Sequence, residues 1–389
     1  MAANGMIGEL VPPPPYTVSN AQVVLSAAEL RAMIRCVGGL YRLSRRSGYR
    51  ERVLPRVPAS GRFDPGHDAV MMGYDFHATA DGPRLIEVNT NAGGLLLPWL
   101  PSSGEKELRP PSARARDRLL ATFFEEFALF SGGKRRLRTM AIVDDHPRGQ
   151  FLYPEMAGFA RLFEEKGIRV HIADPGELDG DREGIFCDGE RIDLIYNRHT
   201  DFYLESREMA VIRDAYLARK VCLSPNPFTY ALLADKRRLP LWKDGDFLRE
   251  CGLKEEMIDL LVRVVPESRI LAEAAADEIW RQREAWVFKP VARFGSRGVI
   301  LGKKISRKRF LEFDPAETLL QRYSPPSLTE IPGAEPMKTD LRLFAYRDRV
   351  VGLAARLYRG QVTNMRTPGG GFAAVTWRAN VGTGKREVF

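Results

Sequence analysis

Three oxygen-bearing side chains, those of Asp75, Glu87 and Asn89, stand at a spacing that suits a divalent cation. Apolar and polar residues alternate on both sides of Asp81-Gly82, which predicts two short strands joined by a tight turn. Glu87 and Asn89 are two apart and share a face, which Asp75 can join from the neighbouring strand. Magnesium prefers such carboxylate and amide oxygens. The alternative is an exposed hairpin with ordinary polar faces.

A second group of residues has the chemistry of a phosphate site. Lys289 ends the apolar run 286–288, so a strand there would project its ammonium group into a cleft. The loop that follows has Gly295 and Gly298 around Ser296, and glycines allow backbone amides to approach phosphate oxygens closely. Alone this loop is a weak signal, because most such loops are simple hairpin turns.

Two arginines near the end of the chain, Arg342 and Arg356, are candidates for anion binding. A guanidinium group can form paired hydrogen bonds to a phosphoryl or carboxylate group, which a lysine cannot. Asn364 is expected to donate a hydrogen bond to a reaction intermediate or to ligate a metal. The alternative for the arginines is a pair of ordinary surface residues on strands.

Hydrophobic periodicity predicts the elements that must position these residues. Residues 21–60 are expected to be mainly helical, and residues 69–90 to form the hairpin. Residues 112–130 predict a helix, because leucines and phenylalanines recur at helical spacing and Gly132-Gly133 ends it.

Strands and helices alternate in the middle of the chain, which predicts a small open parallel α/β domain. The expected strands are 139–143, 168–172 and 192–196, with a helix at 153–166. Arg198 and His199 follow the last strand, where open α/β sheets expose ligand-binding loops. Arg198 would hold an anionic substrate there; a polar loop with a capping residue is an equal alternative.

The composition is that of an ordinary globular enzyme. The chain has 389 residues, 44% hydrophobic and 28% charged, enough for two or three domains. We expect neither a secretory signal nor a membrane span. Four cysteines without paired spacing indicate a reduced, cytoplasmic protein. The net charge of +9 suits a phosphate-rich cofactor, and because the basic runs are scattered we expect no nucleic-acid partner.

Taken in order, these motifs resemble the ATP-grasp superfamily of ligases. Asp-Phe, a short turn, Leu-Ile-Glu-Val-Asn and a Gly-Gly run resemble the metal-binding end of D-alanine–D-alanine ligase. The lysines, the glycine loop and residues 321–323 are similar to the nucleotide-binding half. Residues 339–371 resemble the ligases that add glutamate to ribosomal protein, where Asp-x-Arg opens a strand, a hairpin returns to a second Arg, and an Asn-containing Gly-Gly segment follows.

The resemblance implies a role for each candidate residue. Asp75, Glu87 and Asn89 would hold the metal, and Arg342, Arg356 and Asn364 would be catalytic. Residues 321–323 would form the hinge beside the adenine and ribose. They lack the acidic residues that commonly hold the ribose in this superfamily. The implied ATP contacts are Lys236, Lys289, Arg293, Gly295, Ser296, Arg297, Gly298, Gln321 and Tyr323.

The metal hairpin opens this chain, whereas in that superfamily it closes the catalytic domain. We therefore expect an α/β fold in circularly permuted form, with α+β ATP-grasp lobes and a small parallel α/β pre-ATP-grasp domain. The chain resembles the circularly permuted ATP-grasp group that includes glutathionylspermidine-synthase-like proteins. The expected division is 1–130 for the permuted segment with the hairpin, 131–225 for the pre-ATP-grasp domain and 226–389 for the nucleotide-binding lobes.

The resemblance implies an ATP-dependent carboxylate–amine ligase that forms a C–N bond through an acyl phosphate and releases ADP and phosphate. The expected cofactors are ATP and two Mg²⁺ ions, with Mn²⁺ as an alternative. The substrates would be a small-molecule or peptide carboxylate and an amine. Two alternatives stay open: a small-molecule kinase, and a nucleotide-binding or RNA-binding protein without turnover. The identities of the substrates and the oligomeric state are left open.

Overall fold

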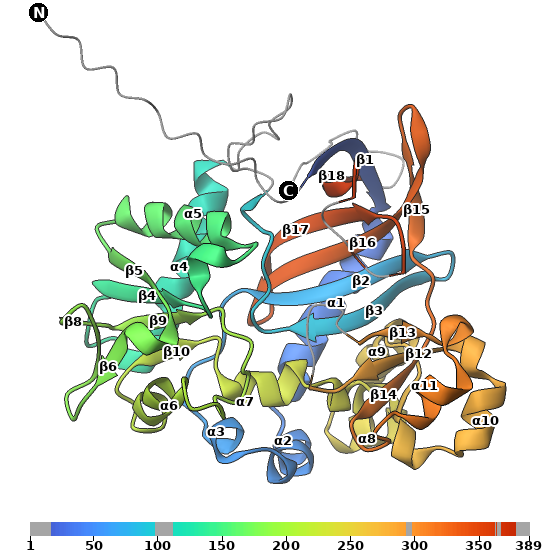
Figure 1. Ribbon diagram of the computed structural model, residues 1–389, viewed down its shortest axis with the longest axis horizontal. Coiled ribbons are helices and arrows are strands. Elements are labelled where there is room, and N and C mark those ends of the chain that lie inside the picture. The colour runs from blue at the N-terminus through green and yellow to red at the C-terminus, as the bar shows by residue number, and fades with distance from the viewer. Residues whose placement is uncertain (1–16, 98–111, 293–297, 362, 364–366, 379–389) are drawn as a thin grey trace, which may run out of the picture.

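The computed structural model describes residues 17–97, 112–292, 298–361, 363 and 367–378. This part of the chain forms a seven-stranded sheet, two four-stranded sheets and one three-stranded sheet, with helices packed between and around them (Figure 1). No helix within these residues is both long and apolar enough to cross a membrane.

The seven-stranded sheet joins strands from both ends of the chain. Its order is β1-β18-β17-β16-β2-β3, and β15 also pairs with β16. In Figure 1 the blue and cyan strands β1, β2 and β3 lie in one sheet with the orange and red strands. The strands are β1 (Val18–Ser26), β2 (Met72–Thr79), β3 (Gly82–Asn89), β15 (Ser327–Ile331), β16 (Ala334–Tyr346), β17 (Arg349–Tyr358) and β18 (Gly371–Arg378).

The register of this sheet sets which polar residues can meet. Strands β2 and β3 form the expected hairpin, with Asp75 opposite Glu87 and a β-bulge directly after Asp75. Strand β2 also runs antiparallel to β16, where Asp75 lies opposite Arg342. The prediction that the hairpin pairs with the sheet of Arg342 and Arg356 is therefore confirmed.

The segment 21–60 is mainly helical, as expected, but residues 21–26 belong to a strand. Strand β1 alternates buried and exposed residues, the period of a strand with one covered face. The helix starts only after Ser26, whose side chain forms a capping box with Glu29. The helices here are α1 (Ala27–Ser44), α2 (Ser47–Val53) and α3 (Ala59–Arg62).

The middle of the chain forms the expected open parallel sheet, in the order β10-β9-β4-β5. The helix expected at 112–130 is confirmed as α4 (Ala113–Ser131), which ends at Gly132 in the left-handed conformation. The other elements are β4 (Thr139–Val143), α5 (Tyr153–Glu164), β5 (Arg169–Ala173), β9 (Leu194–Asn197), α6 (Ala210–Leu217) and β10 (Cys222–Ser224). The three-stranded sheet beside it has β6 (Leu178–Gly180), β7 (Ile185–Cys187) and β8 (Glu190–Arg191).

An antiparallel sheet in the order β11-β14-β12-β13 forms the remaining lobe. Its own apolar core includes Trp286, Phe288 and Phe310. A short irregular helical stretch leads into it, with a π turn at Tyr230–Ala234. The elements are α7 (Pro227–Thr229), α8 (Gly245–Glu250), α9 (Glu255–Val264), β11 (Ser268–Ile270), α10 (Ala276–Arg281), β12 (Trp286–Pro290), β13 (Ile300–Leu301), α11 (Arg307–Leu311) and β14 (Thr318–Arg322).

The two faces of the seven-stranded sheet pack against different partners. Leu343 and Ala345 of β16 belong to the core shared with α1 and α9. Phe344 and Tyr346 belong to the core shared with α4 and α5. Because side chains alternate along a strand, Arg342 points to the same side as Phe344, toward the parallel α/β domain.

Candidate active site

A cleft of about 580 Å³ lies where the three main sheets meet, a volume within the usual range for small-molecule sites. The hairpin β2–β3, strands β12 and β14, strands β16 and β17, and the loops after β4 and β9 all contribute to its wall. The charged and amide side chains that line it are Asp75, Glu87, Asn89, Asn91, Asp144, Asp145, Gln150, Arg198, Lys289, Gln321, Arg322, Lys338, Asp340, Arg342, Arg356 and Gln361.

The three residues expected to hold a metal lie together on the hairpin. The Nδ2 atom of Asn89 is 3.3 Å from Asp75 Oδ2 and 3.3 Å from Glu87 Oε1. This contact follows from the register, which places Asp75 opposite Glu87 and leaves Asn89 two residues along the same strand.

Asp75 is held by two arginines, a partnership that the sequence did not predict. Arg342 donates from Nε to Asp75 Oδ1 at 2.6 Å and from Nη2 to Oδ2 at 2.6 Å. The Nη2 atom of Arg356 lies 3.0 Å from Oδ2. Burial acts to raise the pKa of Asp75, but the two positive charges and their hydrogen bonds outweigh it and hold this pKa well below its usual range.

Asp340 completes the network and was missed as a site residue. Arg356 donates to Asp340 Oδ1 from Nε at 3.1 Å and from Nη2 at 2.5 Å. Thr363 donates to the other oxygen at 3.0 Å. The Asp-x-Arg motif carried the signal, because residues two apart on a strand share a face. The two aspartates therefore neutralise the two arginines.

Lys289 reaches the cleft from β12 as expected, with its side chain almost wholly buried. It donates to Gln321 Oε1 at 2.6 Å and to the backbone carbonyl of Ile86 at 3.1 Å. Burial lowers the pKa of its ammonium group to about 8, against the opposing charge of Glu87. Lys289, Gln321 and Glu87 are thus brought together although they come from three different strands.

The other expected nucleotide contacts are placed only in part. Tyr323 lines the cleft, whereas Lys236 is not among the described residues that line it; its Nζ lies 3.5 Å from the carbonyl of Val291. Gly298 has φ of +76°, which favours glycine. Arg293, Gly295, Ser296, Arg297 and Asn364 lie outside the described residues.

Arg198 also lines the cleft, but its guanidinium group forms hydrogen bonds within the protein. It donates to the carbonyl of Ala92 at 2.8 Å and to the hydroxyl of Tyr196 at 3.0 Å. Glu155 lies beside it and accepts hydrogen bonds from the backbone of Gly94 and Leu96. This pair holds the loop after β3 against the parallel domain.

Asp144, at the carboxyl end of β4, is a further cleft residue that sequence reasoning passed over. Burial raises its pKa to about 6, although the charge of Arg198 acts in the opposite direction. Its position is the usual one for ligand contacts in open α/β sheets, and this rule was the signal that could have found it.

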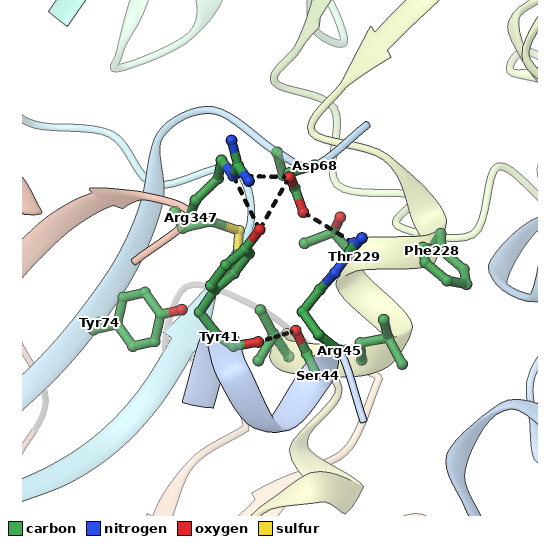
Figure 2. Close-up of a pocket in the computed structure, with 12 residues that line it drawn as sticks. Tyr41, Ser44, Arg45, Asp68, Tyr74, Phe228, Thr229 and Arg347 are labelled. Atoms are coloured by element: carbon green, nitrogen blue, oxygen red, sulfur yellow. Dashed lines mark hydrogen bonds and ion pairs between the residues drawn. The ribbon is translucent and has the colours of Figure 1, made fainter. Parts of the chain in front are cut away.

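A second cavity of only about 20 Å³ lies between α1 and the other end of β16 (Figure 2). The hydroxyl of Tyr41 lies 3.3 Å from Asp68 Oδ2 and accepts from Arg347 Nε at 2.9 Å. Arg45 approaches the other oxygen of Asp68 at 3.6 Å. This volume is that of a single water-sized sphere, so the cavity is far too small for a nucleotide.

Comparison with known proteins gives a likeness in fold. No protein-family model and no curated protein matches the chain. A glutathione synthetase-like effector from Globodera pallida, in its apo form, aligns over 92% of this chain and 89% of its own, with 11% identity and a TM-score of 0.56. A putative γ-glutamylcysteine synthetase from Methylobacillus flagellatus aligns over 85% of each chain with 10% identity and a TM-score of 0.47.

The first of these likenesses extends over nearly the whole of both chains. At 11% identity it concerns the fold and not the reaction. The described residues therefore share a mixed α/β architecture with a glutathione synthetase-like protein.

Proposed function

We propose that the protein is an ATP-dependent carboxylate–amine ligase that forms a C–N bond through an acyl phosphate. One observation carries the proposal: an early hairpin bearing Glu87 and Asn89 pairs with a late strand bearing Arg342, beside buried Lys289. Oxygen donors, paired arginines and a lysine in one cleft are the groups that phosphoryl transfer needs.

The fold is proposed to be a circularly permuted ATP-grasp. In this proposal β2 and β3 supply the metal hairpin that would otherwise follow the strands of β16 and β17 along the chain. Support comes from the sheet order, in which β2 is the direct neighbour of β16 although Asp75 and Arg342 are 267 residues apart. The division at 130 and 225 remains part of the same proposal.

Two of the three residues expected to bind magnesium have the surroundings of a metal ligand. Glu87 and Asn89 line the cleft, and their carboxylate and amide oxygens would be the ligands. Asp75 fits less well, because both its oxygens accept from guanidinium groups. We therefore assign Glu87 and Asn89 as the principal ligands and Asp75 as the residue that positions Arg342 and Arg356. A bound ion would offset the charge of the ATP phosphates.

The remaining residues would act by position and charge. The ammonium group of Lys289 would donate a hydrogen bond to a phosphate oxygen in place of its present bond to Gln321. Arg342 and Arg356, held by Asp75 and Asp340, would contact the phosphoryl group as it moves from ATP to the substrate carboxylate. An amine then attacks the acyl carbon of the acyl phosphate. The C–N bond forms, the C–O bond to the phosphate breaks, the nitrogen loses a proton to solvent, and inorganic phosphate leaves. A reducing, cytoplasmic setting remains our expectation.

The test is ADP release with pools of amino acids, peptides and polyamines, followed by mass spectrometry of the product. Once the acid is known, ¹⁸O in its carboxylate should appear in the released phosphate, and hydroxylamine should trap the acyl group as a hydroxamate. A stable phosphorylated product would indicate a kinase instead. No ATP consumption, together with RNA affinity that falls steeply with salt, would indicate a binding protein without turnover.

A further inference from the structure

A cluster of metal-binding side chains lies away from the cleft, where the three-stranded sheet meets the edge strand β5. His171 comes from β5, Cys187 ends β7, and Asp188 begins the turn to β8. One candidate ligand atom from each residue lies within 4.8 Å of the other two. Imidazole nitrogen, thiolate sulfur and carboxylate oxygen are the ligand types of zinc sites.

The turn between β7 and β8 sets the position of two of these residues. Cys187 pairs with Glu190 across a two-residue connection. Asp188 and Gly189 have φ of +50° and +74°, as an Asp-Gly hairpin turn of the mirror-image type requires. The turn therefore holds Asp188 directly beside Cys187 without any contribution from a metal.

Glu190 orients the imidazole of His171 toward the other two residues. The Nε2 atom of His171 lies 3.0 Å from Glu190 Oε2, and the guanidinium of Arg169 pairs with the other carboxylate oxygen. A carboxylate partner places the proton on Nε2, so the Nδ1 lone pair is available. Nδ1 lies 3.7 Å from Asp188 Oδ2. Metal-binding histidines typically have such a carboxylate on the second nitrogen.

The distance of 3.7 Å between His171 Nδ1 and Asp188 Oδ2 agrees with two ligands of one tetrahedral ion. Metal–ligand distances of about 2.0–2.3 Å imply ligand–ligand distances of roughly 3.3–3.8 Å. We propose that His171, Cys187 and Asp188 form a zinc-type site whose fourth position is open to solvent. When the metal–sulfur bond forms, the Cys187 thiol loses its proton to solvent. The thiolate and the Asp188 carboxylate then balance the charge of the ion.

Such an ion would cross-link the three-stranded sheet β6–β8 to the parallel domain. It would join β5 to the β7–β8 hairpin, and an ion that binds only the folded state stabilises it by mass action. This inference does not depend on the proposed ligase activity, because none of its residues lines the cleft in the described part of the chain.

The test is titration of the full-length, metal-free protein with Co²⁺, followed by competition with Zn²⁺. We expect the charge-transfer absorption of thiolate-bound cobalt, one ion per chain, and a rise in melting temperature with Zn²⁺. Cys187→Ser should remove the charge-transfer band, and His171→Ala should weaken binding. Glu190→Gln keeps all three ligands and should weaken binding by about 10–100-fold.

Two matched variants serve as controls. Cys251→Ser changes a buried cysteine at the end of α8, outside the cluster, and should keep the band. His146→Ala removes the histidine of an exposed cluster with Asp145 and Asp174, and should also leave Co²⁺ binding unchanged. A band that persists in Cys187→Ser, or Co²⁺ affinity that is equal in wild type, His171→Ala and Glu190→Gln, would overturn the proposal. If Cys187→Ser does not fold, the Co²⁺ affinities of His171→Ala and Glu190→Gln still decide the test.

Discussion

Strand β16 carries two buried polar clusters, and they differ in what lies beside them. Near its middle, Asp340 and Arg342 join a network that faces a cleft of about 580 Å³. At its end, Tyr346 donates to Glu126, whose side chain is fully buried. A cavity beside the next residue, Arg347, has only about 20 Å³ (Figure 2). Only the first cluster has room for a substrate.

In the second cluster, both carboxylate oxygens of Glu126 have partners within the protein. Glu126 Oε1 accepts from Ser224 at 2.9 Å and lies 2.8 Å from His67 Nδ1. Its Oε2 atom accepts from Tyr346 at 2.9 Å and from the backbone of Asp68 at 3.2 Å. These bonds join α4, β10 and β16, so the carboxylate ties together the sheets on either side of it.

The comparison shows that buried charge alone does not identify an active site. In both clusters carboxylates meet donors from distant parts of the chain. What separates them is the open space, together with Lys289 and Glu87 at the edge of that space. We therefore expect changes at the second cluster to affect stability, and changes at the first to affect nucleotide binding and turnover.

The largest expected effect is on stability, from Glu126→Ala. The variant removes the partner of three buried side chains and of one backbone N–H, so the free energy of unfolding should fall by about 3–5 kcal/mol. Chemical denaturation measures this. Glu125→Ala is the matched control, because the neighbouring carboxylate pairs with Arg347 and Arg349 near the surface and its loss should cost under about 1 kcal/mol. Equal losses of unfolding free energy in Glu126→Ala and Glu125→Ala would show that the buried carboxylate contributes no more to stability than the surface one.

Glu87→Gln should have the next largest effect, on turnover. The change removes one negative charge from the proposed magnesium ligands, so ATP consumption should fall by at least about 100-fold. The free energy of unfolding should stay within about 0.5 kcal/mol of wild type. Asp81→Asn, at the exposed tip of the same hairpin, is the control and should remain active. Normal turnover in Glu87→Gln would remove this residue from the site.

The affinity for ATP should depend on pH through Lys289. Its pKa is lowered to about 8 by burial, and only the protonated form attracts phosphate. Affinity should therefore be constant below pH 8 and fall above it, by up to about tenfold per pH unit. Calorimetry across this range measures the effect. In Lys289→Met the affinity should be weak and this pH dependence absent; a variant with the wild-type profile would show that another group titrates.

Tyr41→Phe at the small cavity should have the smallest effect. It removes the hydroxyl between Asp68 and Arg347, which costs about 1 kcal/mol of unfolding free energy. Nucleotide affinity in the folded variant should equal that of wild type. A drop in ATP affinity with unchanged stability would mean that the small cavity takes part in nucleotide binding.

Local patterns predicted the elements that carry the site. Alternation around the turn identified β2 and β3, and the strand–helix alternation identified the parallel domain. Strand β1 was missed, because its short alternation runs directly into the amphipathic helix α1. Local periodicity does not show which of two adjoining patterns ends first; here the capping box at Ser26 marks that point.

The partners inside the site could not be predicted from local patterns. The pairing of Asp75 with Arg342 depends on the register between strands 267 residues apart. The role of Arg198 depends on its contact with Ala92, which is 106 residues away. Both arginines were expected to bind an anionic ligand, and both already contact protein oxygens. Only tertiary structure determines whether a guanidinium group is satisfied internally.

The most direct test of the central claim is a crystal structure of the protein with Mg²⁺ and a non-hydrolysable ATP analogue. Our account predicts phosphate oxygens in contact with Lys289, and a metal that joins those phosphates to Glu87 and Asn89. The guanidinium groups of Arg342 and Arg356 should face the terminal phosphate. A nucleotide bound outside this cleft, or a metal–phosphate complex that leaves Glu87 beyond ligand distance, would contradict the proposed site and the permuted ATP-grasp interpretation.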